Sequence, residues 1–89
     1  MTLALRDGVA AADTDYGITL LDADSGQYWT LNPTAALALR TLLDGGTSAQ
    51  AAQALTEQYA VDAGTAGRDV EMLVSELHEA GLVRERPAP

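Results

Sequence analysis

The chain has 89 residues, no cysteine and a formal net charge of −8. Such a chain buries only roughly 60% of the surface that it exposes when unfolded, so we expect one domain over residues 1–89 with a modest core in about residues 9–83. The lack of cysteine excludes disulfides, thiol catalysis and thiolate metal sites. No run of about 18 apolar residues is present to cross a membrane, and the start, MTLALRDG, lacks a signal-peptide pattern. These features predict a cytoplasmic protein without a membrane partner.

The charge distribution argues against a nucleic-acid partner. Binding to phosphates depends on clustered Lys and Arg, whereas this chain has no lysine and five scattered arginines, at positions 6, 40, 68, 84 and 86. An acidic balance suits a basic or neutral protein partner, but it also serves solubility alone. The charge alone does not decide between a protein partner and a role in solubility.

The first part of the chain predicts a hairpin. Residues 1–8 are expected to be a loose start, and Val9–Asp13 is a short, Ala-rich candidate strand. Residues 16–22 form a better strand, followed by the turn DADSG, in which Gly26 can adopt a positive φ. The turn resembles the start of a calcium loop, but Gln27 occupies the sixth position, where such a loop needs glycine. We therefore interpret the segment as a hairpin turn.

The second strand of this hairpin, residues 26–31, contains the single tryptophan of the chain. Alternation along a strand places Tyr28 and Thr30 on one face and Gln27, Trp29 and Leu31 on the other. Both faces carry large apolar groups, so we expect one to pack on the helices and the other to be only partly covered. Trp29 either anchors the core or belongs to a docking surface.

Three helices follow, near residues 33–44, 48–59 and 63–80. Asn32-Pro33 is an N-cap followed by a good first helical residue, and Thr47 with Gln50 forms a capping box. Asp62 or Thr65 caps the third helix, and Gly81 ends it. A charged tail containing proline is expected over residues 84–89.

Apolar spacing defines the inner face of each helix. Strands followed by helices indicate an α+β fold, here a small three-stranded antiparallel sheet followed by a three-helix bundle, winged-helix-like in outline. The apolar positions are Ala35, Ala36, Leu39, Leu42 and Leu43 in the first helix, Ala51, Ala52, Leu55 and Tyr59 in the second, and Val70, Leu73, Val74 and Leu77 in the third.

The sequence offers no catalytic constellation. The single histidine, His78, has no nucleophile or orienting partner that the sequence nominates, no serine lies in a G-x-S-x-G motif, and Gly45-Gly46 lacks the lysine of a phosphate loop. Glu71, Glu76 and Glu79 are interpreted as a solvated helix face. We expect a protein that is not an enzyme and that uses no cofactor or metal.

Binding is the remaining class of function. A small sheet has edge strands with free N–H and C=O groups, which proteins usually protect. Residues 27–31 contain no charge and no proline. Such an edge is suited to β-strand addition, in which main-chain bonds give affinity and side-chain pockets give specificity.

Several segments together resemble the PqqD-like family, the peptide-recognition domains of ribosomal peptide natural-product pathways. The matching segments are YWTLN and the following PTAA, LLDGGT, YAVD, and the stretch from Leu73 to Val83 that ends in GLV. The G-x-Y-W-x-L-N-P spelling at 26–33 is similar to the stand-alone leader-binding proteins of lasso-peptide clusters.

The resemblance implies that the leader of a precursor peptide adds as a strand beside residues 27–31, in a cleft against the third helix. It also implies delivery of the precursor to a separate leader peptidase, with ring closure by a third protein. The implied edge is Gln27, Tyr28, Trp29, Thr30 and Leu31. The implied pocket wall is Val70, Leu73, Val74 and Leu77, with Met72 and Glu76 at its rim.

Three alternatives remain beside the leader-binding module. A PqqD-type chaperone that presents its peptide to a radical SAM enzyme would have the same fold. A winged-helix DNA-binding protein is opposed by the missing basic patch, and an enzyme has no candidate residues. The Y-W-x-L-N-P spelling favours the first interpretation over the chaperone.

Overall fold

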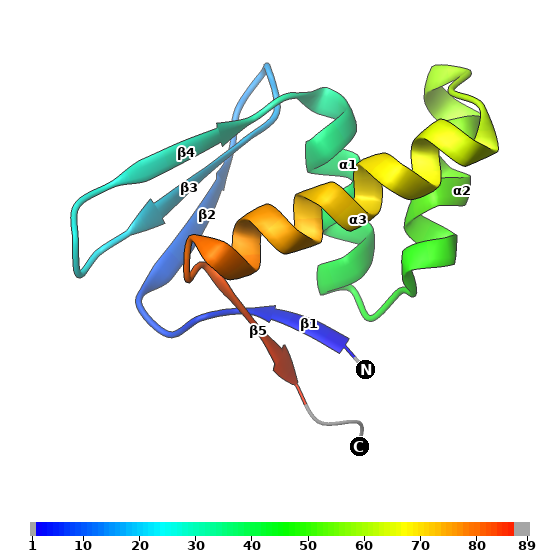
Figure 1. Cartoon of the computed structure of the whole chain (residues 1–89). Coiled ribbons are helices and arrows are strands. Elements are labelled where there is room, and N and C mark those ends of the chain that lie inside the picture. The colour runs from blue at the N-terminus through cyan, green and yellow to red at the C-terminus, as the bar shows by residue number, and fades with distance from the viewer. Residues whose placement is uncertain (1, 87–89) are drawn as a thin grey trace.

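A computed structural model describes residues 2–86 as five strands and three helices. The strands β2, β3 and β4 form one antiparallel sheet, and β1 with β5 forms a second, two-stranded sheet. The predicted α+β fold, a three-stranded antiparallel sheet followed by three helices, is confirmed (Figure 1). The elements are β1 (Thr2–Leu5), β2 (Val9–Asp13), β3 (Ile18–Asp22), β4 (Tyr28–Leu31), α1 (Pro33–Leu43), α2 (Ser48–Tyr59), α3 (Ala63–Glu79) and β5 (Val83–Arg86).

The three-stranded sheet has β3 in its centre and β2 and β4 at its edges. On the inner face, the buried Ile18 and Leu20 lie opposite Leu31 and Trp29 of β4. Trp29 and Leu31 are half-buried and pack against the core, so Trp29 contributes to it, and its part in docking stays a prediction. The outer face carries Tyr28, which is 69% exposed, and the prediction of one packed and one partly covered face is confirmed.

The strand β3 begins two residues later than predicted because a turn occupies residues 14–17. The Thr14 hydroxyl accepts hydrogen bonds from the N–H groups of Tyr16 and Gly17, and the Thr14 N–H donates to the Gly17 carbonyl. Gly17 then passes so close to β4 that a Cβ there would lie 2.0 Å from the Leu31 carbonyl oxygen. Only glycine fits this crossing.

The helix ends follow the predicted caps. The Asn32 side chain accepts the N–H of Ala35, and Thr47 with Gln50 forms the capping box that begins α2. Of the two candidates for α3, Asp62 is the cap, and it accepts the N–H of Thr65. Gly81, with φ of +73°, ends α3, and the Leu82 N–H returns to the Leu77 carbonyl at 3.0 Å. This pair of features is a Schellman motif.

The second sheet corrects two expectations. Residues 2–5 of the predicted loose start form β1, and residues 83–86, which include part of the predicted tail, form β5. The two strands pair antiparallel with Leu3 opposite Glu85 and Leu5 opposite Val83. Residues 87–89 lie outside the described part of the chain. Local sequence patterns did not predict this sheet because it forms between the two ends of the chain. Leu3 and Val83 are both buried in the core, and the strands that carry them pair through their backbones.

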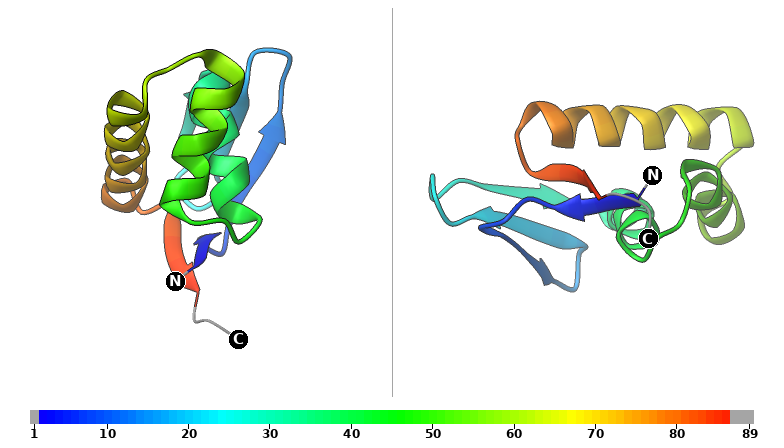
Figure 2. Two further views of the ribbon diagram at one scale, coloured as in Figure 1. Left: turned by 90° about the vertical axis from the view of Figure 1, so that its right-hand side faces the viewer. Right: turned by 90° about the horizontal axis from the view of Figure 1, so that it is seen from below.

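The core surrounds α1, whose Ala36, Ala38, Leu39 and Leu42 are buried. Helix α3 crosses α1, and its C-terminal end extends toward the three-stranded sheet (Figures 1 and 2). Tyr59, expected on the inner stripe of α2, is instead exposed at the last position of that helix. Within residues 2–86, no helix combines the length and apolar character needed to cross a bilayer.

Candidate peptide-binding site

The backbone of β4 has one side facing β3 and one side without a neighbouring strand in residues 2–86. The Asp22 N–H donates to the Gln27 carbonyl at 2.9 Å, so Gln27 faces β3. Hydrogen-bonding directions alternate along an antiparallel strand. The N–H and C=O groups of Tyr28 and Thr30 therefore point outward, where an added strand would meet them.

A hollow of about 290 Å³ begins directly beyond the end of β4. Its apolar lining comes from α1, α2 and α3, and its polar lining comes from both ends of the opening. Asn32 and Thr34 lie at the side that follows β4, and Asp69 and Glu76 lie at the α3 side. The residues that line it are Asn32, Thr34, Ala35, Ala38, Leu55, Asp69, Met72, Leu73 and Glu76.

Three of the predicted α3 residues line this hollow, namely Met72, Leu73 and Glu76. Met72 is 59% exposed, whereas Leu73 is almost fully buried and forms part of the floor. The spacing of Asp69, Met72 or Leu73, and Glu76 places all of them on one helix face. This face is therefore both apolar at its centre and acidic at its margins.

The other predicted α3 residues lie elsewhere. Val70 and Leu77 are buried in the core beneath the helix, at 1% and 3% exposure. Val74 lines a different hollow of about 150 Å³ with Leu42 and His78, because it lies on the opposite side of α3 from Met72. The structure thus brings only part of the predicted wall to the hollow, and a direct contact of the other three with a peptide stays a prediction.

Of the five predicted edge residues, Gln27 lies just before β4 and the other four form it, and the five differ in exposure. Gln27, Tyr28 and Thr30 are exposed, and Trp29 and Leu31 are half-buried. Sequence reasoning did not single out the remaining residues of the hollow. Helical spacing alone places Asp69 one turn before Met72, but Ala35 and Leu55 carried no signal beyond core spacing, and Ala38 lay outside the predicted apolar positions.

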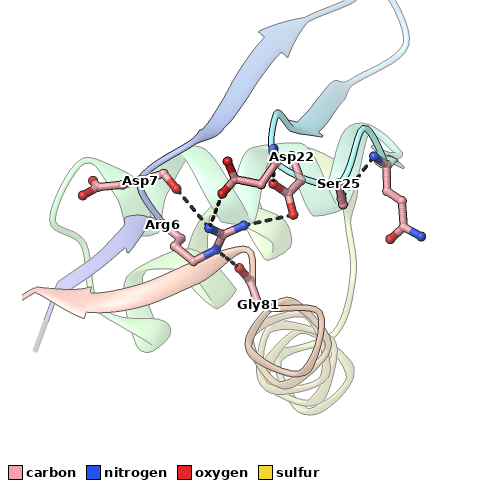
Figure 3. Close-up of polar contacts among 7 residues, drawn as sticks. Arg6, Asp7, Asp22, Ser25 and Gly81 are labelled. Carbon is pink, nitrogen blue, oxygen red and sulfur yellow. Dashed lines mark hydrogen bonds and ion pairs between the residues drawn. The ribbon is translucent and has the colours of Figure 1, made fainter.

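A polar cluster holds the β3–β4 turn against the end of α3 (Figure 3). The Arg6 guanidinium lies 2.9 Å from Asp22 and 3.3 Å from Asp24, and it donates to the carbonyls of Asp7 and Gly81. The hydrogen bonds that the Arg6 guanidinium donates to the carboxylates of Asp24 and Asp22 raise its pKa. The guanidinium therefore stays charged and joins three segments.

Asp22 is the buried member of this cluster. Burial disfavours its charged form, but the Asp24 N–H, the Ser25 hydroxyl and the Arg6 guanidinium together hold its pKa below the usual value. The sequence placed Asp22 at the end of a strand and the start of a turn but gave no sign of this ion pair, because Arg6 lies 16 positions away in a segment that was expected to be loose.

The described residues do not group into a metal site. Within residues 2–86, no three His, Asp or Glu side chains come together as ligands. His78 is exposed on α3. The chemistry that the candidate site offers is backbone hydrogen bonding beside an apolar hollow with an acidic margin.

A three-stranded antiparallel sheet followed by three helices, with one edge of the sheet open, places the chain in the class of winged-helix-like α+β domains. The family described as coenzyme PQQ synthesis protein D (PqqD) matches residues 17–83. The chain belongs to the PqqD family, and the resemblance inferred from the sequence is confirmed.

Two solved structures are similar to the chain over nearly its whole length. One described as lasso peptide synthetase B1 complexed with the leader peptide is 46% identical, with a TM-score of 0.88, and the match covers 96% of this chain and 100% of that chain. Another, TbiB1 in complex with the TbiA(beta) leader peptide, is 24% identical, with a TM-score of 0.82 and coverage of 99% and 100%; it supports the fold alone. No curated protein matches the chain significantly.

Proposed function

We propose that this chain binds the leader region of a ribosomal precursor peptide by β-strand addition along β4. It acts without catalysis, and it delivers the precursor to a separate leader peptidase in lasso-peptide biosynthesis. The observation that carries the proposal is the outward-facing backbone of Tyr28 and Thr30 in a fold whose 46% identical relative holds a leader peptide.

The hollow beyond β4 supplies the specificity that backbone pairing lacks. A peptide that pairs with Tyr28 and Thr30 and continues past Leu31 reaches Asn32 and enters the hollow. An apolar side chain of the peptide fits its floor, which contains Leu55 and Leu73. Carboxylates at the margin favour a neighbouring cationic or neutral polar residue over an acidic one.

Delivery to a second protein follows from what strand addition supplies. Backbone pairing and one side-chain pocket give affinity and orientation, whereas peptide-bond hydrolysis needs a positioned nucleophile or activated water. A leader that is held as an added strand leaves its downstream end free for a peptidase. Cleavage is therefore assigned to a partner protein.

The direct test uses the leader peptide found with lasso peptide synthetase B1, or the N-terminal half of a precursor encoded beside this chain's gene. Titration calorimetry should show saturable binding. Amide hydrogen exchange should then slow at Tyr28 and Thr30 but not at Ala11 of the opposite edge. Absence of binding by both peptides, or protection confined to another face, would contradict the proposal.

A PqqD-type chaperone that presents its peptide to a radical SAM enzyme is the second candidate, and the match to the PqqD family favours it. Both functions use the same peptide-binding edge. They differ in the protein that receives the bound peptide, a peptidase in one and a radical SAM enzyme in the other. Co-purification of the chain–leader complex with a neighbouring peptidase or with a neighbouring radical SAM enzyme distinguishes them. If the gene for this chain has neighbouring genes for a small precursor and a peptidase, that arrangement supports the lasso pathway.

A further inference from the structure

The proposed peptide cleft has two walls that are held by different parts of the fold. One wall is β4, which contacts α1, and the other is α3, which contacts α1, α2 and β5. At one end of β4 the chain continues through Asn32 into α1, so the covalent backbone sets the position of the strand. At the other end, no continuous stretch of chain joins the β3–β4 turn to Gly81, which follows the C-cap of α3.

The Arg6 side chain bridges the β3–β4 turn and Gly81 at this end of the proposed cleft. Its guanidinium donates to the Gly81 carbonyl at the end of α3 and pairs with Asp22 and Asp24 in the hairpin turn (Figure 3). The Asp22 side chain is only 11% exposed, so this ion pair is shielded from solvent more than a surface pair is. One side chain therefore joins the segment that follows α3 to the turn that precedes β4.

The backbone around Arg6 reinforces the same connection. The Arg6 N–H donates to the Leu82 carbonyl at 2.9 Å, and the Ala23 N–H donates to the Gly8 carbonyl at 2.9 Å. Gly8 has φ of +89°, and a Cβ there would lie 3.3 Å from an Asp24 carboxylate oxygen. The loop of residues 6–8 is thus built to sit between the hairpin turn and the end of α3.

We propose that Arg6 is a positioning residue for leader binding. It sets the separation of β4 and α3 and does not contact the peptide. This inference rests on the proposed function of the cleft. Guanidinium geometry is required, because only a planar fork reaches the Gly81 carbonyl just past α3 and the carboxylates of Asp22 and Asp24 at once. An ammonium group on a flexible stem can keep one of these partners but not all three.

The test compares Arg6→Ala with Arg40→Ala. Arg40 forms the matched control, since its guanidinium pairs with Asp13 at 2.8 Å and joins α1 to β2, away from the cleft. With the leader of lasso peptide synthetase B1 as probe, we expect affinity to fall about tenfold or more for Arg6→Ala, as for loss of one or two strand hydrogen bonds, and by less than about twofold for Arg40→Ala. Folding of each variant is measured by circular dichroism.

Two further measurements separate positioning from general stability. Arg6→Lys should fold and recover affinity only in part. Spin labels at Gln27→Cys and Glu79→Cys, unambiguous in a chain without cysteine, should report a broader distance distribution in Arg6→Ala and in Arg6→Lys than in the parent or Arg40→Ala.

The outcomes distinguish the inference from the proposed function. A parent chain that fails to bind the probe overturns the proposed function and the inference with it. A parent that binds, with a folded Arg6→Ala that binds equally well, overturns the inference alone. If Arg6→Ala does not fold, Arg6→Lys decides: parental affinity with a parental distance distribution overturns the positioning role.

Discussion

The two edges of the three-stranded sheet differ in what lies beside them. On β2 the N–H of Ala11 faces outward, as that of Thr30 does on β4, because Thr14 and Gly17 fix the alternation on that side. Yet β2 carries exposed alanines and ends in Asp13, whose carboxylate pairs with Arg40. By contrast, β4 carries half-buried Trp29 and leads into the hollow at Asn32.

The comparison teaches that an unprotected edge does not by itself make a peptide site. Main-chain groups are available on both edges, so they supply affinity without choosing between them. We expect the hollow that begins at Asn32, directly after β4, to decide where a leader binds. Each of the following changes tests one part of this difference.

The largest effect is expected from Gly17→Ala, which disturbs the close contact between Gly17 and the end of β4. A Cβ at Gly17 would lie 2.0 Å from the Leu31 carbonyl oxygen, so the backbone must shift and the free energy of unfolding should fall by at least about 3 kcal/mol. Gly67→Ala is the matched control, since its Cβ meets nothing within 4 Å inside α3, and it should stabilise by about 1 kcal/mol. Urea unfolding of both variants measures this; equal stabilities would show that the crossing is not tight.

The next effect separates the two edges directly. Thr30→Pro removes an outward-facing donor of β4, and Ala11→Pro removes one of β2. Losing two or three added-strand hydrogen bonds at about 1 kcal/mol each should weaken leader binding roughly tenfold or more for Thr30→Pro and leave it unchanged for Ala11→Pro. Calorimetry with circular dichroism on each variant checks this. A folded Thr30→Pro variant that binds as the parent does would exclude strand addition at β4.

A smaller effect tests the hollow rather than the edge. Met72→Ala trims an exposed side chain at the hollow, so it should change stability by less than about 0.5 kcal/mol and weaken leader binding by about threefold to tenfold, a loss of roughly 1 kcal/mol of apolar contact. Leu21→Ala, on the exposed outer face of the sheet, is the control and should leave affinity unchanged. Equal affinities of the parent and Met72→Ala would mean that the peptide does not reach this hollow.

The smallest effect is the pH dependence that two carboxylates give to stability, Asp22 beside the β3–β4 turn and Asp62 at the N-cap of α3. The pKa of Asp22 is held below its usual value of 3.8, and that of Asp62 is also lowered, chiefly by the hydroxyl and N–H of Thr65. The native chain therefore binds these protons less readily than the unfolded chain does, so the stabilisation is complete above about pH 4 to 5 and is lost as the pH falls below the usual value.

Urea midpoints between about pH 7 and pH 3 test this. They should fall more steeply with decreasing pH in the parent than in Asp22→Asn, and the Asp22→Asn, Asp62→Asn double variant should be flatter still. Parallel curves for the parent and both variants would show that neither carboxylate stabilises the native state through its charge.

The sequence by itself determined the helices and the type of fold. The cap at Asn32, the box at Thr47 and the glycine at 81 act within five residues of their own partners, so they operate whatever the rest of the chain does. The alternation of β4 followed from the period of a strand, and the family followed from short segments that the sequence displays directly.

Only the tertiary structure decided three features: the second sheet, which main-chain groups of β4 face outward, and which residues line the hollow. The pairing of Leu3 with Glu85 and the contact of Arg6 with Gly81 join the two ends of the chain, and no local pattern encodes such a distance. Apolar spacing in α3 predicted which residues avoid water, but not which of them lie beneath the helix. Burial of Val70 and exposure of Met72 beside a hollow depend on where α1 and α2 pack, because a pocket is the space that several elements leave between them.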